Sequence, residues 1–151
     1  MPIASAIGFE LRGRADRIDL FTDGRAAILD YKSGRAPSNK QMERLLSPQL
    51  ALEGAMALAG AFADLRPSGL AEFVHIRLTG GDPPGEEKPA PIDANASAQQ
   101  AVQLLSRLVA RYDSDAQGYV SWAMRERVGD TGDYDHLARV LEWSLAEEPE
   151  E

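Results

Sequence analysis

The sequence contains no cysteine, and none of its apolar runs is long. The lack of cysteine excludes disulfides, thiolate zinc sites and iron–sulfur clusters bound by this chain. It also fits a cytoplasmic protein, which is the localisation we expect. No apolar run approaches the roughly 20 residues of a membrane span, and the N-terminus lacks the basic-then-apolar pattern of a signal peptide. The composition therefore predicts a globular chain without membrane contact.

The chain length of 151 residues is typical of one domain with a modest core. The net charge of −8 argues against bulk electrostatic attraction to nucleic acid. The charge is uneven, because residues 1–50 hold 8 Lys and Arg against 6 Asp and Glu, whereas residues 51–151 hold 8 against 18. We expect one domain over residues 1–146, followed by a disordered acidic tail over residues 147–151. The abrupt start leads us to expect an excised piece of a longer polypeptide, or else a short natural leader.

Four segments of the sequence predict β-strands, through apolar runs or period-two alternation. Asp23-Gly24 predicts a tight hairpin turn between the second and third strands, because both residues tolerate positive φ. In the last strand the alternation places His75 on the polar face, so we expect a surface or helix-covered histidine and not a ligand. The predicted strands cover residues 7–12, 17–21, 25–32 and 71–78.

Helical patterns follow the predicted hairpins. The first helix has Ser47 as its N-cap and Pro48 at its first position. Its many small residues would let it lie close to a sheet, with Leu52, Met56 and either Ala59 or Ala63 facing the core. The order of elements predicts a small α/β or α+β core with a C-terminal helical appendage. The predicted helices cover residues 47–64, 96–112, 118–127 and 134–145, and the predicted loops cover residues 33–38 and 80–91.

Asp30-Tyr31-Lys32, at the end of an apolar run, is the most informative feature of the chain. The period of two in a strand puts Asp30 and Lys32 on one face and Tyr31 on the other, where we expect it in the core. Ionised Asp and Lys at the end of a buried strand are costly unless they pair or bind a metal. Asp16 lies upstream and can approach Asp30 if the hairpin register allows it.

Two carboxylates, Asp16 and Asp30, offer the hard oxygen ligands that suit Mg²⁺ or Mn²⁺, and the Tyr31 carbonyl could add another. Lys32 beside the metal would orient a water, help to deprotonate it or stabilise charge at phosphorus. Gln49 lies in the first turn of a helix, where free N–H groups favour a phosphate. Metal-assisted phosphodiester hydrolysis is the reaction that suits this set.

A simpler interpretation is also open, because Asp and Lys at a strand end often form a surface ion pair that is nearly neutral in energy. The additional presence of Asp16 and Gln49 favours an active site. Of the neighbouring residues, we expect Arg17 to be structural and Asp19 to be solvated or paired with an arginine.

Three segments of the sequence stand out together: Gly13-x-x-Asp16-Arg17-Ile18-Asp19, Ile28-x-Asp30-Tyr31-Lys32-Ser33-Gly34 and Ser47-Pro48-Gln49-Leu50-x-Leu52-Glu53. As a set they resemble the RecB-type branch of the PD-(D/E)XK nuclease superfamily. Within it, the chain is similar to the C-terminal nuclease domain of the AddB subunit of the AddAB helicase–nuclease of α-proteobacteria. The resemblance implies a restriction-endonuclease-like core, a small mixed β-sheet flanked by helices.

The resemblance also implies roles and partners. It makes Asp16 and Asp30 the metal-binding residues, Lys32 the catalytic lysine and Gln49 the glutamine of the helix motif. It implies a Mg²⁺-dependent exonuclease, with Mn²⁺ as a substitute, that cuts single-stranded DNA fed by a motor subunit of AddA type during double-strand-break repair.

The chain departs from the family in two ways. It begins too late to contain the family's first helix with its acidic residue, for which Glu10 is at best a partial substitute. It also lacks the four cysteines that hold an iron–sulfur cluster in many relatives. Two other functions therefore stay open: a non-catalytic structural or DNA-threading module, and a nuclease acting on RNA or in phage processing. A homodimer that covers exposed apolar surface is a further option.

Overall fold

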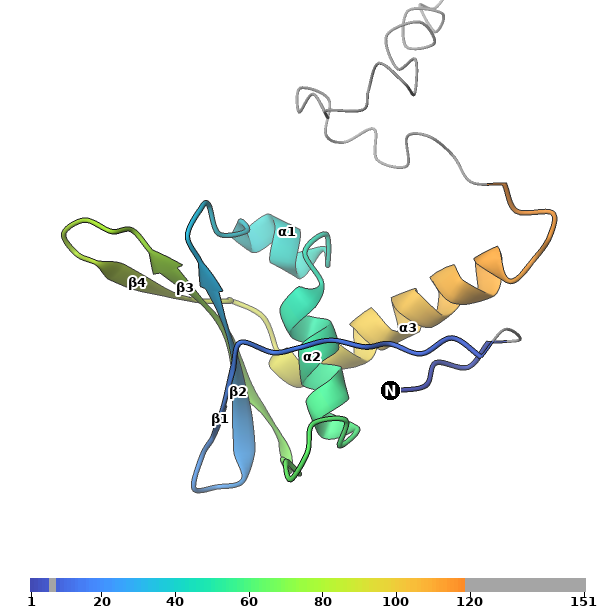
Figure 1. Cartoon of the computed structure of the whole chain (residues 1–151), viewed down its shortest axis with the longest axis horizontal. Coiled ribbons are helices and arrows are strands. Elements are labelled where there is room, and N and C mark those ends of the chain that lie inside the picture. Colours follow the sequence, from blue (N-terminus) through green and yellow to red (C-terminus); the bar gives the residue numbers. More distant parts are fainter. Residues whose placement is uncertain (6–7, 119–151) are drawn as a thin grey trace, which may run out of the picture. The chain divides into compact units, whose positions relative to one another are not determined.

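The structure, a computed structural model, describes residues 1–5 and 8–118. One compact unit comprises Met1–Ser114, and of the second unit, Asp115–Glu151, only residues 115–118 are described. Three predictions therefore lie outside the described residues, apart from residue 118: the helices over residues 118–127 and 134–145 and the acidic tail. The described elements are β1 (Arg17–Leu20), β2 (Arg25–Lys32), α1 (Asn39–Glu43), α2 (Gln49–Leu58), β3 (Gly69–Leu78), β4 (Gly85–Pro89) and α3 (Ala94–Tyr112) (Figure 1).

The described strands form one mixed sheet in the order β1-β2-β3-β4. β2 pairs antiparallel with β1 and parallel with β3, and β4 is antiparallel to β3. Parallel neighbours need a crossover connection, which α1 and α2 provide between β2 and β3. The mixed sheet with flanking helices confirms the predicted restriction-endonuclease-like α+β fold. None of the described helices combines the length and apolar character needed to cross a membrane.

The hairpin between β1 and β2 turns where the sequence predicts it. Gly24 has a φ of +85°, and its N–H donates to the Phe21 carbonyl at 2.9 Å. Asp23 does not adopt positive φ, and its carboxylate instead accepts from the Arg25 N–H at 2.9 Å. Only the glycine therefore supplies the left-handed conformation that closes the hairpin.

The prediction of a strand over residues 7–12 is wrong. Its described residues pair with the start of the chain and not with the sheet. The Ile3 N–H donates to the Phe9 carbonyl at 3.0 Å, and the Leu11 N–H donates to the Met1 carbonyl at 2.9 Å. Only one isolated bridge, between Pro2 and Glu10, has strand-like pairing there.

The β3–β4 hairpin corrects two predictions. Residues 80–91 were predicted as a loop, but β4 pairs with β3 from Val74 to Leu78. Because both faces of this charged edge strand are largely exposed, it lacks the hydrophobic pattern of a buried strand. The alternation also placed Phe73 and His75 on the polar face of β3, but both are buried, and Val74 on the opposite face is buried as well. A parallel pair is covered on both faces, so alternation does not identify the core side.

Helix α2 begins at Gln49 with Pro48 as its N-cap, so the predicted cap at Ser47 is wrong by one residue, and the helix ends six residues before the predicted end. Gly60 stops it: its φ is +69°, its N–H donates to Ala57, and the Ala61 N–H donates to Met56. These two hydrogen bonds form a Schellman motif. Ala59 and Ala63 are both exposed, so both alternatives for the last position of the predicted core stripe are wrong. The short helix α1 was not predicted, although Ser38 and Gln41 form a capping box at its start.

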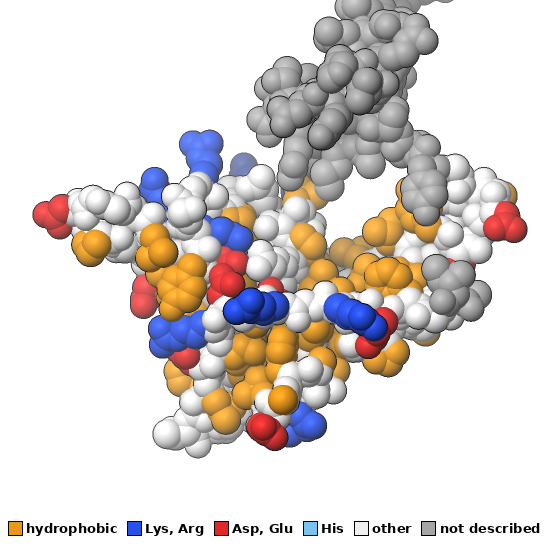
Figure 2. Space-filling view, in the orientation of Figure 1, with side chains coloured by type: hydrophobic (Ala, Val, Ile, Leu, Met, Phe, Trp, Pro, Cys, Tyr) orange, Lys and Arg blue, Asp and Glu red, His pale blue; other side chains and the backbone are white. Residues whose placement is uncertain are grey.

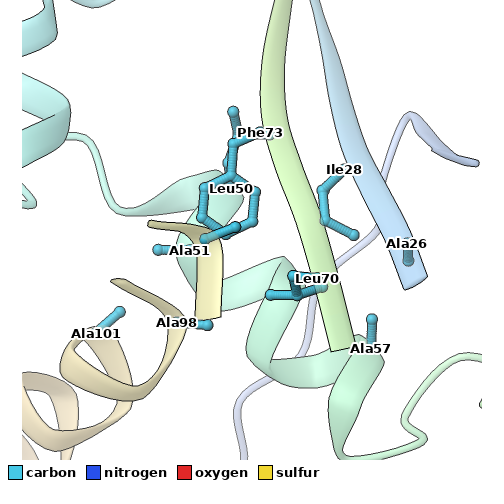
Figure 3. Packing of buried hydrophobic residues seen from close by; sticks show 10 residues of the cluster. Ala26, Ile28, Leu50, Ala51, Ala57, Leu70, Phe73, Ala98 and Ala101 are labelled. Atoms are coloured by element: carbon cyan, nitrogen blue, oxygen red, sulfur yellow. The ribbon is translucent and has the colours of Figure 1, made fainter. Parts of the chain in front are cut away.

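The main core lies between the sheet and helices α2 and α3 (Figure 3). Gly54 of α2 lies so close to β3 that an added Cβ would be 2.8 Å from Leu70 Cδ1 and 2.9 Å from Phe73 Cε1. Helix α3 is fixed to the same strand by Asn95, whose side chain bonds both the N–H and the carbonyl of Leu70 at 2.9 Å. The closely packed buried residues are Ala26, Ile28, Leu50, Ala51, Ala57, Leu70, Phe73, Ala94, Ala98 and Ala101.

Replacing Gly54 by Val tests this close approach. We expect Gly54→Val to lower the free energy of unfolding by about 1–3 kcal/mol, because the added carbons overpack the contact with Leu70 and Phe73. Urea denaturation would measure it. Gly34→Val is the control, since an added Cβ at Gly34 has no neighbour within 4 Å. Equal stability of the two variants would contradict the packing described here.

Candidate active site

The carboxylate of Asp30 is the centre of a cluster of polar side chains. Asp30 lies near the end of β2, opposite His75 of β3, and only 2% of its surface is exposed. Its Oδ1 accepts from Lys32 Nζ at 3.1 Å and from Gln49 Nε2 at 2.8 Å. Its Oδ2 is 2.8 Å from Lys32 Nζ and 3.2 Å from His75 Nδ1. Three donor groups from three elements thus hold one desolvated carboxylate.

Lys32 and Gln49 also contact each other. As predicted, Lys32 shares a face of β2 with Asp30, and its Nζ donates to Gln49 Oε1 at 3.2 Å. The first residue of α2 therefore accepts from the lysine through one end of its amide and donates to Asp30 through the other. This arrangement agrees with the sequence prediction that Asp30, Lys32 and Gln49 lie together.

Asp16 lies immediately before β1 and joins the cluster from its exposed edge. The hairpin register pairs Arg17 with Leu29, so Asp16 comes next to the segment that contains Asp30 and Tyr31. Its Oδ2 accepts from the Tyr31 N–H at 3.0 Å. The structure thus brings all four predicted site residues to one end of β2.

The side chain of Tyr31 lies outside the core, contrary to the prediction. It is 40% exposed, and its hydroxyl is 3.5 Å from Arg17 Nη1. Arg17 also forms two 2.7 Å hydrogen bonds with Asp19, which confirms the arginine-paired reading of Asp19. Glu10 is ion-paired with Arg12 at 2.7 Å on the initial segment.

His75 is a site residue that the sequence reasoning missed. It is only 2% exposed and contacts Asp30, although we expected it on a polar face. An ionised carboxylate only accepts hydrogen bonds, so His75 Nδ1 carries the proton. Burial lowers the pKa of His75, while the hydrogen bond to Asp30 opposes that shift. A neutral imidazole therefore orients the Asp30 carboxylate.

Glu53 is the second residue that the sequence reasoning missed. It lies one helical turn after Gln49, and Gln49 Nε2 donates to its Oε1 at 3.1 Å. The spacing of four residues, which puts both side chains on one helix face, is the signal that could have found it. Burial raises the pKa of Glu53; the hydrogen bond from Gln49 opposes this shift, and the nearby charges of Asp30 and Asp16 add to it.

The oxygen donors of the site fit a divalent cation. In the part of the chain that the structure describes, no three His, Asp or Glu side chains form a ready-made group for a metal. Mg²⁺, however, usually binds through one or two carboxylates and keeps several waters. Asp16 and Asp30 supply such carboxylates, and Glu53 has a buried oxygen, Oε2, without a hydrogen-bond partner among the described residues. The Tyr31 carbonyl stays a predicted ligand.

Comparison with known proteins agrees with this geometry. The family described as the PD-(D/E)XK nuclease superfamily matches residues 1–122. The chain is similar to uncharacterized proteins of Rickettsia conorii, Rickettsia felis and Rickettsia bellii, each 46% identical over 50 residues. Those residues are 33% of this chain but only 6% of each relative's length. No solved structure gives a significant match.

The buried neutral His75 predicts a dependence of stability on pH. Because its folded pKa is lowered, the unfolded chain binds the proton more readily once the pH falls below the ordinary value of 6.5. Its stabilising contribution is present above that pH and is lost as the pH falls toward the folded pKa. Urea denaturation over this range would measure the loss.

His75→Gln is the matched variant, because an amide can still donate to Asp30. We expect the stability difference between the wild type and His75→Gln to shift in favour of the variant as the pH falls below 6.5. Comparing the two proteins cancels the opposite contribution of Glu53, whose raised pKa favours the fold at low pH. A difference that does not change with pH would show that His75 is not held neutral.

Proposed function

The chain belongs to the PD-(D/E)XK nuclease superfamily, and from this premise we propose that it is a metal-dependent DNA exonuclease domain. In this proposal it hydrolyses phosphodiester bonds in the cytoplasm, as part of a helicase–nuclease complex of AddAB type that acts in double-strand-break repair and recombination. The observation that carries the proposal is the buried Asp30 carboxylate with Lys32 and Gln49 bound to it and Asp16 at its edge.

Asp16 and Asp30 would hold the Mg²⁺ ion, for which Mn²⁺ could substitute. The ion, when bound, lowers the pKa of a water and polarises the phosphate. Asp30 suits this role because three donors already fix the direction of its carboxylate before any cation arrives. A ligand held in this way loses little conformational freedom on binding.

Lys32 would deliver positive charge to the reacting phosphate or orient the attacking water. Its side chain is partly exposed, whereas the Asp30 side chain beneath it is almost fully buried. Gln49 Oε1 keeps the ammonium at this position. The lysine would thus lie between the buried carboxylate and solvent, on the side from which a phosphodiester would approach. An oriented positive charge at this position would stabilise the negative charge that develops in the transition state.

DNA binding in this proposal depends on local basic residues and not on the net charge. Figure 2 shows basic and acidic side chains interspersed on the face in view. The four predicted site residues belong to the first 50 residues of the chain, which carry an excess of positive charge. A motor subunit of AddA type would feed the single strand, so that the domain itself needs only short-range phosphate contacts.

A second candidate is a non-catalytic structural or DNA-threading module of the same complex. The net charge of −8 supports it, since a repulsive overall field does not favour independent binding of DNA. Such a module need not bind a divalent cation at Asp16 and Asp30, which distinguishes the two candidates.

Replacing Asp30 by Asn tests the proposed function. Asparagine keeps the shape but removes the charge that would hold the cation, so we expect Mn²⁺-dependent cleavage of a labelled single-stranded oligonucleotide to fall by at least about 100-fold. Asp19→Asn, which removes a partly exposed carboxylate paired with Arg17 on the same hairpin, is the control and should keep wild-type activity. Full activity of Asp30→Asn would refute the assignment, and an inactive wild type that binds no Mn²⁺ would favour the non-catalytic module.

A further inference from the structure

Glu53 has one carboxylate oxygen that the described fold leaves unused. Only 6% of the residue is exposed, and Oε2 is buried without a hydrogen-bond partner among the described residues. A buried carboxylate oxygen without a partner is costly, and native proteins retain few of them. Its retention here calls for a ligand or a function.

The direction of this carboxylate is set by Gln49. The amide nitrogen of Gln49 donates both to Asp30 Oδ1 at 2.8 Å and to Glu53 Oε1 at 3.1 Å. The two carboxylates are therefore separated by a single donor atom. Because Oε1 is committed to Gln49, the remaining oxygen of Glu53 is the one free to serve the site.

Three carboxyl groups gather at this site, and Glu53 is influenced by the other two. Burial is the main cause that raises the pKa of Glu53, and the charges of Asp30 and Asp16 add to it, while Lys32 opposes it. That lysine is already shared between Asp30 and Gln49. A divalent cation beside these carboxyl groups would favour the charged form of Glu53 and offset its repulsion from Asp30 and Asp16.

We propose that Glu53 is the third carboxylate of the divalent-cation site of Asp16 and Asp30, and that its Oε2 acts through the water ligands of the cation. Contact through water agrees with the finding that no three His, Asp or Glu side chains among the described residues are placed to hold a metal ion directly. Residues that hold the ligands or waters of a metal in this way commonly contribute 10- to 100-fold, roughly, to metal affinity. This inference rests on the cation site of the proposed function.

Titration calorimetry with Mn²⁺ tests the inference on the whole chain. Glu53→Gln removes the charge but keeps an oxygen that can accept from Gln49 Nε2, so the position of Gln49 is preserved. We expect this variant to bind Mn²⁺ at least about tenfold more weakly than the wild type. Glu43→Gln, which removes an exposed carboxylate from the end of α1, should bind as the wild type does. Thermal unfolding in EDTA would verify that both variants are folded.

Measuring Asp30→Asn beside these variants distinguishes a failure of the role of Glu53 from a failure of the proposed cation site. If Asp30→Asn loses Mn²⁺ binding while Glu53→Gln keeps wild-type affinity, the role of Glu53 is refuted and the cation site stands. If the wild type binds no Mn²⁺, or if Asp30→Asn binds it normally, the cation site itself is refuted, and the role of Glu53 with it. Weaker binding in both variants, with Glu43→Gln unchanged, supports the inference.

Discussion

The burial of one carboxylate, that of Asp30, is the constraint on which the rest of the site depends. A desolvated charge at the end of a central strand is unfavourable unless donors surround it. The fold supplies them from β2, β3 and α2, as Lys32, His75 and Gln49. The hydrogen bonds to Asp30 also fix the positions of the three donors. A charge that would destabilise an isolated strand therefore orders the side chains of the site.

The position of α2 connects the hydrophobic core to this polar cluster. Gly54 lets the helix lie against Leu70 and Phe73, and the same helix presents Gln49 and Glu53 to Asp30. A shift of the helix away from the sheet would therefore lengthen the hydrogen bonds at the site. Close packing of apolar residues thus determines the geometry of polar groups that lie only one turn away.

Sequence reasoning predicted the parts of the fold and the site that depend on local patterns. The period of two placed Asp30 and Lys32 on one face, and the Ser-Pro-Gln signal placed a helix start beside them. Sequence reasoning failed where tertiary contacts, and not local patterns, determine which residues are buried or paired. His75 belongs to a strand buried on both faces, and the charged strand β4 pairs with β3 through the backbone without a buried apolar face of its own. The spacing of four residues places Glu53 on the same helix face as Gln49, but that spacing alone does not show that Glu53 is buried.

An anomalous-difference map from a crystal of this chain soaked in Mn²⁺ would test most directly whether Asp16 and Asp30 bind a divalent cation. We expect one strong peak beside the carboxylates of these two residues. A peak that lies away from Asp30, or a map without any peak in crystals with an accessible site, would contradict the assignment of this cluster as a metal-dependent active site.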